Sequence, residues 1–428
     1  MSGSLLVNFV YCHPVGHAIE AVHRCHGYRL ANPDLRIGVV LNSATPCELA
    51  EISPFIDEVY PVDVDVFDGT VDFRPQLGAI APDWDQIVED ERASQAWQRS
   101  SFPGLARYYD DARAYLRPGT ATFPYQRGGH LRLPIAATRP AASPAPVSPA
   151  AATRAPASPT QVPAGPAADT ATAASPARAT VTAADSSAAD STAIGPSSGH
   201  TTSASASEPV RIAVLPGGSS PRELYPSVRS WRLVLDALAE RFPGVEFLFV
   251  GKLNDDGRTS TSFGRDEFAG LVASVERSVS VVDRPLLDQL GAVAGSDVLV
   301  SPHTGFGMAA LAVGAPWLTI SGNKWPEYYF PGTPFYSVLP DVSRFPCYTL
   351  FGPDPEPVDD DGPRSPSMSF ERISADLGEI VEGAARLVER RWDFETAMVD
   401  HYRRMWALPV GASRWLWSVD DVHRAYLP

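Results

Sequence analysis

At 428 residues the chain is longer than one hydrophobic core usually accommodates, so we expect two domains. Its formal net charge of −15 at pH 7 argues against a nucleic-acid partner, because such a partner selects for a basic face. The chain has four cysteines, too few for a dense disulfide framework, and no apolar run approaches the roughly 20 residues of a membrane helix. With no basic segment ahead of the first apolar run, we expect a cytoplasmic protein with no integral membrane segment.

The first 64 residues alternate between strand and helix patterns. Short apolar runs bounded by turn residues predict buried strands at 5–11, 35–42 and 58–64. Between them, apolar residues at helical spacing predict a helix from 17 until Asn32-Pro33, and a shorter helix within 46–57. Strands and helices that alternate at this spacing indicate the opening of a doubly wound parallel sheet.

Residues 65–135 carry weaker patterns. The segment 84–100 has helical character with two acidic clusters and a thin apolar face, whereas 102–119 predicts a clearer helix that ends at Pro118-Gly119. The segment 125–136 resembles a turn into a short strand. We assign residues 1–135 to an N-terminal Rossmann-like domain.

The composition changes completely between Ala136 and Glu208. Ala, Pro, Ser and Thr dominate this stretch, aromatic residues vanish, and large aliphatic residues are scarce. Such a segment cannot bury enough apolar surface to offset the entropy lost on ordering. We therefore predict a disordered linker over 136–208.

A second alternation of strands and helices follows the linker. We assign 209–350 to a second doubly wound, Rossmann-like domain. Residues 351–428 hold an acidic, Pro-rich loop and a Trp-rich helical tail long enough to reach back across both domains. The expected strands are 211–218, 245–251 and 279–283, and the expected helices are 227–242, 265–277 and 285–294.

Two glycine-containing loops of the second domain are placed to bind an anion. In DVLVSPHTGFGMAALAVGAPWLTISG, 297–322, an apolar strand runs into the turn 301–307, which opens a helix of small residues. Free N–H groups and the helix dipole favour an anion at such a helix N-terminus. The alternative is an ordinary turn with Thr304 or Ser301 as the N-cap. The second loop, 216–219, ends the first strand of the domain, where ligands of α/β folds gather.

These features resemble the GT-B glycosyltransferases, and the motifs are similar to the heptosyltransferase-like group, glycosyltransferase family 9. SDVLVSPHTGFGMAALAVGAPWLTISG resembles that family's ADLVVGNDTGPMHLAAALGVPVVALFG, LPGGSSPRELYP resembles its Pro-Gly-Ala-Ser strand end, and PFIDEVYPVD resembles its NPYVDRVIPVD. The resemblance implies the GT-B fold, in which two Rossmann-like α/β domains face a central cleft. It also implies that 1–135 is the acceptor-side domain and that 209–350 binds the nucleotide sugar. Two positions depart from the family: His303 replaces its Asp, and Glu223 replaces its Lys, leaving Arg222 as the nearest cation.

The resemblance implies a metal-independent, inverting glycosyltransferase that moves a sugar from a nucleotide-diphosphate donor to a hydroxyl or amine acceptor. It implies no cofactor, and its partners are the nucleotide sugar and a small-molecule or glycan acceptor. Loop 301–307 would hold the diphosphate, and two residues of NKWPEYYFPG would contact the donor. The predicted donor-binding residues are Gly217, Gly218, Ser219, Arg222, Ser301, His303, Thr304, Gly305, Phe306, Gly307, Lys324 and Glu327.

The reaction also needs a general base, for which His17 is our candidate and His13 the reserve. His17 follows Gly16 at the start of the first predicted helix. The heptosyltransferase-like family has an Asp after the matching glycine, but Pro-Val-Gly-His resembles the catalytic turn of macrolide and plant-type GT-B enzymes. The alternative is a histidine that caps the helix or fills a polar niche. The Cys and His residues of 12–26 match no metal-ligand spacing, so we predict no metal site.

Two other functions remain open. A sugar-nucleotide epimerase of the same fold would need extra carboxylates near the anomeric carbon. A non-catalytic sugar-nucleotide-binding protein would keep the loop and lack the base.

Overall fold

The structure is a computed structural model that describes residues 3–11, 15–126, 130–140, 208–254, 260–322, 332–347 and 355–407. Most of the predicted linker lies outside these ranges. So do three of the predicted site residues: His13, Lys324 and Glu327.

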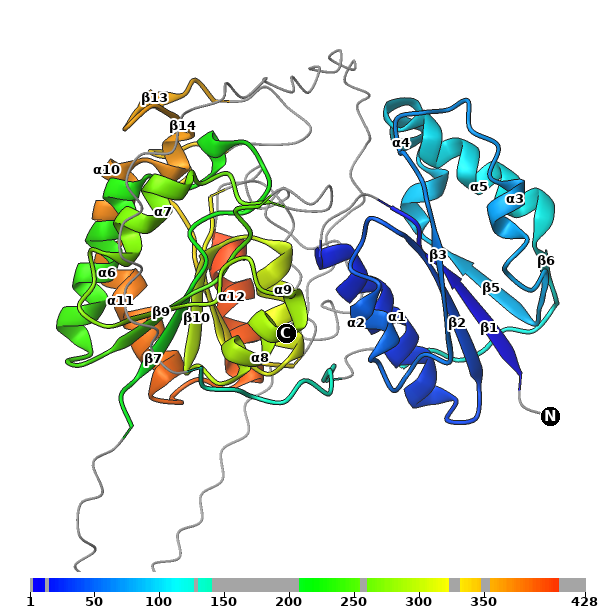
Figure 1. Ribbon diagram of the computed structural model, residues 1–428, viewed down its shortest axis with the longest axis horizontal. Coiled ribbons are helices and arrows are strands. Elements are labelled where there is room, and N and C mark those ends of the chain that lie inside the picture. Colours follow the sequence, from blue (N-terminus) through cyan, green and yellow to red (C-terminus); the bar gives the residue numbers. More distant parts are fainter. Residues whose placement is uncertain are drawn as a thin grey trace, which may run out of the picture. The chain divides into compact units, whose positions relative to one another are not determined.

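A four-stranded parallel sheet forms the N-terminal half, with strand order β3-β2-β1-β5. Side chains alternate across it: Leu5 and Val7 face a core shared with α1, whereas Leu6 and Val10 face the core under α5. Figure 1 shows α1 and α2 on one face of this sheet and α3 and α5 on the other. The elements are β1 (Ser4–Asn8), α1 (Val15–Ala31), β2 (Arg36–Asn42), α2 (Glu48–Glu51), β3 (Glu58–Val62), α3 (Arg74–Leu77), β5 (Gln86–Glu89) and α5 (Pro103–Tyr115).

The prediction of a helix over 84–100 is wrong. The segment instead forms strand β5, a short 3-10 helix at Glu91–Ser94 and helix α4 (Ala96–Ser101). Ile87 and Val88 pair in parallel with Leu6 and Val7 of β1. This pairing satisfies backbone groups along the edge of β1, and that tertiary contact outweighs the local helical propensity of the acidic residues. Two further strands of two residues each, β4 (Asp83–Trp84) and β6 (Arg117–Pro118), pair beside it.

The segment 130–140 forms no strand, in contrast to the prediction of a short strand there. It runs along the second half of the chain with Leu131 and Leu133 buried. The Leu133 N–H donates to the Ala312 carbonyl at 2.9 Å, and the Thr138 N–H donates to the Gly291 carbonyl at 2.8 Å. The first five residues of the predicted linker, 136–140, therefore belong to this packed segment.

A six-stranded parallel sheet forms the second half, with strand order β12-β11-β10-β7-β8-β9. Numbered within the domain, this order is 3-2-1-4-5-6 read from the β9 edge, the arrangement of a dinucleotide-binding fold. The topological switch point, where ligands of such folds bind, lies between β7 and β10. The strands are β7 (Arg211–Val214), β8 (Glu246–Phe249), β9 (Ser278–Ser280), β10 (Val298–Pro302), β11 (Trp317–Ile320) and β12 (Phe335–Val338). The predicted α/β fold with two Rossmann-like parallel sheets is confirmed.

Helices cover both faces of this sheet (Figure 1). One face carries α6, α7, α10 and α11, and the other carries α8, α9 and α12. The described part of the C-terminal tail packs on this second sheet, where α12 contacts β12. Within the described ranges, no helix is long and apolar enough to cross a membrane. The bounds are α6 (Val228–Arg241), α7 (Arg265–Val272), α8 (Leu286–Ala294), α9 (Gly305–Ala312), α10 (Phe370–Ala375), α11 (Leu377–Val388) and α12 (Phe394–Ala407), with 3-10 turns at Arg222–Leu224 and Pro366–Met368 and a hairpin of β13 (Val358–Asp359) and β14 (Pro363–Arg364).

Candidate functional site

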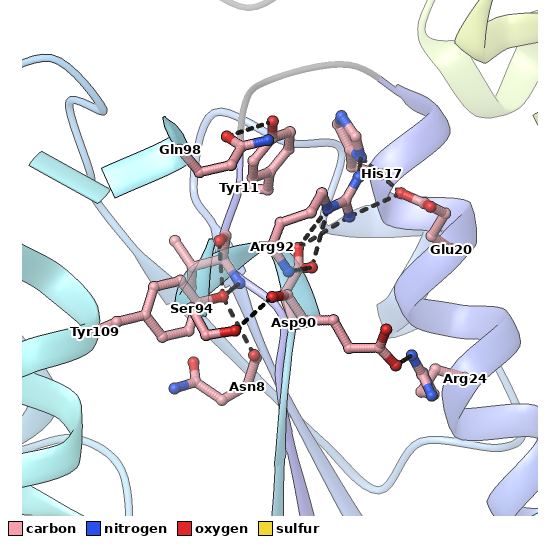
Figure 2. Close-up of polar contacts among 12 residues, drawn as sticks. Asn8, Tyr11, His17, Glu20, Arg24, Asp90, Arg92, Ser94, Gln98 and Tyr109 are labelled. Carbon is pink, nitrogen blue, oxygen red and sulfur yellow. Dashed lines mark hydrogen bonds and ion pairs between the residues drawn. The ribbon is translucent and has the colours of Figure 1, made fainter. Parts of the chain in front are cut away.

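A cluster of polar side chains lies where β1 and β5 end, at the edge of the first sheet where α/β folds bind ligands (Figure 2). Tyr11 follows β1, and Asp90 and Arg92 follow β5. The first two turns of α1 add His17 and Glu20, which lie three residues apart and therefore on one side of the helix.

Charge pairs join these residues into one network. The His17 Nδ1 lies 2.7 Å from the Glu20 Oε2, and the Arg92 Nη2 lies 3.0 Å from the same oxygen. Arg92 also donates from Nε to both carboxylate oxygens of Asp90, at 2.9 and 3.0 Å. The His17, Glu20 and Arg92 side chains are each less than one-fifth exposed. Burial and charge pairing together hold the network in one geometry.

Glu20 stays ionised throughout the physiological range. Burial raises the pKa of this carboxyl, but the positive charge of Arg92 and the contacts with His17 outweigh burial and hold its pKa at about 2. A carboxylate can only accept hydrogen bonds, so the His17 Nδ1 must carry the proton that it donates to Glu20. The Arg92 Nη1 lies farther from Nδ1, at 3.3 Å. In neutral His17 the other ring nitrogen, Nε2, is then the unprotonated one, and Figure 2 shows it on the side away from Glu20.

Aromatic packing fixes the orientation of the imidazole. The Tyr11 ring meets the His17 ring edge to face at 4.6 Å between centroids, and the Arg92 guanidinium lies 4.2 Å from the Tyr11 centroid. The Tyr11 hydroxyl donates to the Gln98 Oε1 at 2.9 Å. His17 is thus part of a built network and does not act as a helix-capping residue.

The loops that follow β7 and β10 meet at the switch point of the second sheet. A Cβ atom added to Gly218 would lie 3.2 Å from the Thr304 Cγ2, so the loops 216–219 and 301–307 are adjacent. Thr304 is the N-cap of α9, and its hydroxyl accepts from the Gly307 N–H at 3.2 Å. The N–H groups of Gly305 and Phe306, at the first two positions of the helix, donate to no other described residue. Two donors and the positive end of a helix dipole therefore converge there.

Three residues of loop 301–307 contact Trp317: Ser301, His303 and Gly307. Ser301 is fully buried, and its hydroxyl accepts from the Trp317 Nε1 at 2.8 Å and donates to the Pro302 carbonyl at 2.8 Å. A Cβ atom at Gly307 would lie 2.2 Å from the Trp317 ring. The imidazole of His303 stacks on the same indole at 6.0 Å. Ser301 therefore packs against Trp317, and its contact with a diphosphate stays a prediction.

The predicted donor residues at and after loop 216–219 differ in their contacts within the protein. The carbonyls of Gly217 and Gly218 accept hydrogen bonds from Thr261 and from the Ser262 N–H, at 3.1 and 2.8 Å. Ser219 is exposed beside them. Arg222 forms an ion pair with Glu267 in α7.

The N-terminal turns of α1 and α9 come together at two glycines. A Cβ atom at Gly305 would lie 2.4 Å from the Gly16 backbone nitrogen, and one at Gly16 would lie 3.3 Å from the Gly305 Cα. Only residues without side chains permit this backbone contact. The contact places His17, the residue after Gly16, near the N-terminus of α9, where the Gly305 and Phe306 N–H groups lie.

Four residues of the first cluster escaped the sequence analysis: Tyr11, Glu20, Asp90 and Arg92. The spacing of His17 and Glu20 on one helix face was the available signal for Glu20. Asp90 and Arg92 could be found only by recognising β5 as a strand whose end faces the end of β1. Among the described residues, no three His, Cys, Asp or Glu side chains form a metal-binding group.

Comparisons with known proteins give likenesses of structure only. No protein-family profile and no curated protein sequence matches the chain. The structure is similar to a glycosyl transferase family 9 protein from Veillonella parvula, at 11% identity and a TM-score of 0.48, covering 91% of this chain and 98% of that one. It is also similar to Escherichia coli ADP-heptose lps heptosyltransferase II, at 11% identity and a TM-score of 0.44, covering 89% and 99%. A third similarity is to a Listeria monocytogenes protein described as a putative UDP-N-acetylglucosamine 2-epimerase, at 11% identity and a TM-score of 0.35, covering 91% of each chain. At this distance the likenesses do not identify a substrate.

Proposed function

We propose that the protein is a metal-independent, inverting glycosyltransferase that uses a nucleotide-diphosphate sugar as donor and a hydroxyl-bearing acceptor. The observation that carries the proposal is the pairing of His17 with the ionised Glu20, one residue from the Gly16–Gly305 contact. This pairing supports a base with a fixed tautomer beside a helix end suited to an anionic leaving group.

In the proposed reaction, the acceptor oxygen attacks the anomeric carbon of the donor while its proton passes to the His17 Nε2. The bond between the anomeric carbon and the diphosphate oxygen breaks, and the nucleotide diphosphate leaves with the electron pair. Attack from the face opposite the leaving group inverts the anomeric configuration. The imidazolium that forms is stabilised by the Glu20 carboxylate, which stays charged because its pKa is about 2.

The leaving group gains negative charge as its bond to the sugar breaks. The N–H groups of Gly305 and Phe306, the first residues of α9, are suited to hydrogen-bond this charge. Oriented amides act without a metal ion and need no reorganisation during the reaction. Thr304 supports the site because its hydroxyl accepts from the Gly307 N–H, which fixes the first turn of α9. His303, Lys324 and Glu327 stay in the proposed donor set.

The epimerase alternative would need a carboxyl group free to move a proton on the sugar. Glu20 accepts a hydrogen bond from Arg92, and the positive charge of Arg92 favours the charged form of this carboxyl. A non-catalytic binding protein would have no use for a histidine with a fixed tautomer. Both contrasts favour a transferase.

A thermal-shift screen against a panel of nucleotide-diphosphate sugars tests the donor half of the proposal. A donor present at 100 times its dissociation constant is expected to stabilise the fold by about 2.7 kcal/mol. The selected donor should then release its nucleotide diphosphate slowly, by transfer to water, in wild type but not in His17→Ala. Stabilisation without release in wild type would favour the non-catalytic alternative.

A further inference from the structure

The Phe67 side chain is exposed to solvent on a loop that hydrogen bonds anchor to α5. It is 62% exposed, the highest fraction among the large apolar side chains of the described residues. The Phe67 N–H nevertheless donates to the Asp65 Oδ1 at 2.9 Å, and the Val66 carbonyl accepts from the Gly104 N–H at 2.9 Å. A Cβ atom at Gly104 would lie 2.0 Å from the Asp65 carbonyl oxygen, so the loop is seated directly on the start of α5. These contacts fix the loop backbone in the conformation that exposes the Phe67 ring.

A series of rings connects Phe67 to the base. The Phe67 centroid lies 5.6 Å from that of Phe102, and Phe102 lies 6.2 Å from Tyr11. Tyr11 contacts His17 at 4.6 Å. Single exposed apolar residues are common on protein surfaces, but a continuous ring series that ends at a proposed catalytic base is not explained by chance exposure.

We propose that Phe67, Phe102 and Tyr11 form an acceptor subsite for a neutral saccharide, whose attacking hydroxyl it delivers to the His17 Nε2. The proposal rests on the function proposed above and adds the acceptor class. A pyranose has an apolar face of C–H groups, which packs on aromatic rings, and a rim of hydroxyl groups, which needs polar partners. Gln98 and Arg92 supply polar groups beside Tyr11.

Charge on the Phe67 loop selects against an anionic acceptor. The segment 63–72, DVDVFDGTVD, carries four aspartates and no basic residue. A phosphorylated or otherwise acidic glycan would meet like charge there, and a fatty chain would remove the solvation of these carboxylates. A neutral sugar incurs neither cost.

Binding to a glycan array that carries neutral and acidic oligosaccharides tests the proposal. The full-length protein is labelled, and four forms are compared: wild type, Phe67→Ala, Phe67→Tyr and the control Leu30→Ala, which removes another exposed apolar side chain. Wild type, Phe67→Tyr and Leu30→Ala are expected to bind neutral glycans alike. Phe67→Ala should bind them about five- to tenfold more weakly, because one stacking ring is lost.

Three outcomes would overturn the subsite: wild type binds only acidic glycans, wild type binds none, or Phe67→Ala matches wild type. His17→Ala on the same array separates this proposal from the proposed function. Loss of the base should leave glycan binding intact, so a failed transfer assay with normal array binding contradicts the base and not the subsite.

Discussion

The His17 Nδ1 lies 2.7 Å from the Glu20 Oε2, and this contact determines which nitrogen of the imidazole can accept a proton. Glu20→Gln replaces a carboxylate by an amide that can donate as well as accept, so the tautomer of His17 is no longer fixed. We expect the transfer rate to fall by about 10- to 100-fold with little change in donor affinity. Steady-state kinetics check this, with Glu91→Gln, an 85% exposed glutamate two residues after β5, as the control. Equal transfer rates in Glu20→Gln and wild type would show that His17 needs no carboxylate at its Nδ1 to act as the base.

Glu20 also gives stability a defined pH dependence. Its pKa is about 2 in the folded chain, below the ordinary value of 4.5, so the unfolded chain binds the proton first as the pH falls. The stabilisation is complete above pH 4.5 and is lost as the pH falls towards 2, by about 3 kcal/mol. Urea unfolding of wild type and Glu20→Gln at several pH values should show their difference in unfolding free energy shrinking through this window. A difference that stays constant between pH 5 and 2 would contradict the assigned charge of Glu20.

Ser301→Ala and Thr304→Val should both lower stability, but only Thr304→Val should weaken donor binding. Ser301→Ala removes the acceptor of the buried Trp317 Nε1, so we expect a loss of about 1–3 kcal/mol in unfolding free energy and an unchanged donor dissociation constant. Thr304→Val removes the N-cap of α9 at a cost of about 1 kcal/mol and should weaken donor binding, since the first helical turn loosens. Chemical denaturation and donor titration separate the two effects. Unchanged donor affinity in Thr304→Val would remove the loop from the donor site.

Gly305 should not tolerate even an alanine. The added methyl group would lie 2.4 Å from the Gly16 backbone nitrogen, and backbone cannot move aside as a side chain can. We expect Gly305→Ala to destabilise the fold by about 1–3 kcal/mol and to weaken donor binding. Gly378→Ala in α11 is the matched control, because nothing lies within 4 Å of its added methyl group. Gly378→Ala should be neutral or stabilising by up to about 1 kcal/mol. Equal melting temperatures for the two variants would contradict the Gly16–Gly305 contact.

Local sequence patterns predicted the two parallel sheets because their strands are short apolar runs buried on both faces. The pattern also identified Thr304 as a possible N-cap, which the structure confirms. The segment after residue 84 was misread, because pairing of β5 with β1 joins residues about 80 positions apart and leaves no local periodicity. Asp90 and Arg92 were missed for the same reason.

The roles within loop 301–307 could not be assigned from spacing alone. Ser301 and Gly307 have the residue types of a phosphate loop, but both contact Trp317, which lies on the neighbouring strand β11. A hydroxyl or a glycine in such a loop serves packing or a ligand depending on what lies behind it. Here Trp317 lies behind the loop because β11 pairs with β10, and this pairing cannot be predicted from the spacing of residues within the loop.

The most direct test of the account compares donor binding and sugar transfer in His17→Ala, using the nucleotide-diphosphate sugar selected by the thermal-shift screen. We expect a donor dissociation constant within about twofold of wild type and a transfer rate reduced by about 10²- to 10⁴-fold, because the acceptor proton loses its base. A transfer rate equal to that of wild type would contradict the role of His17.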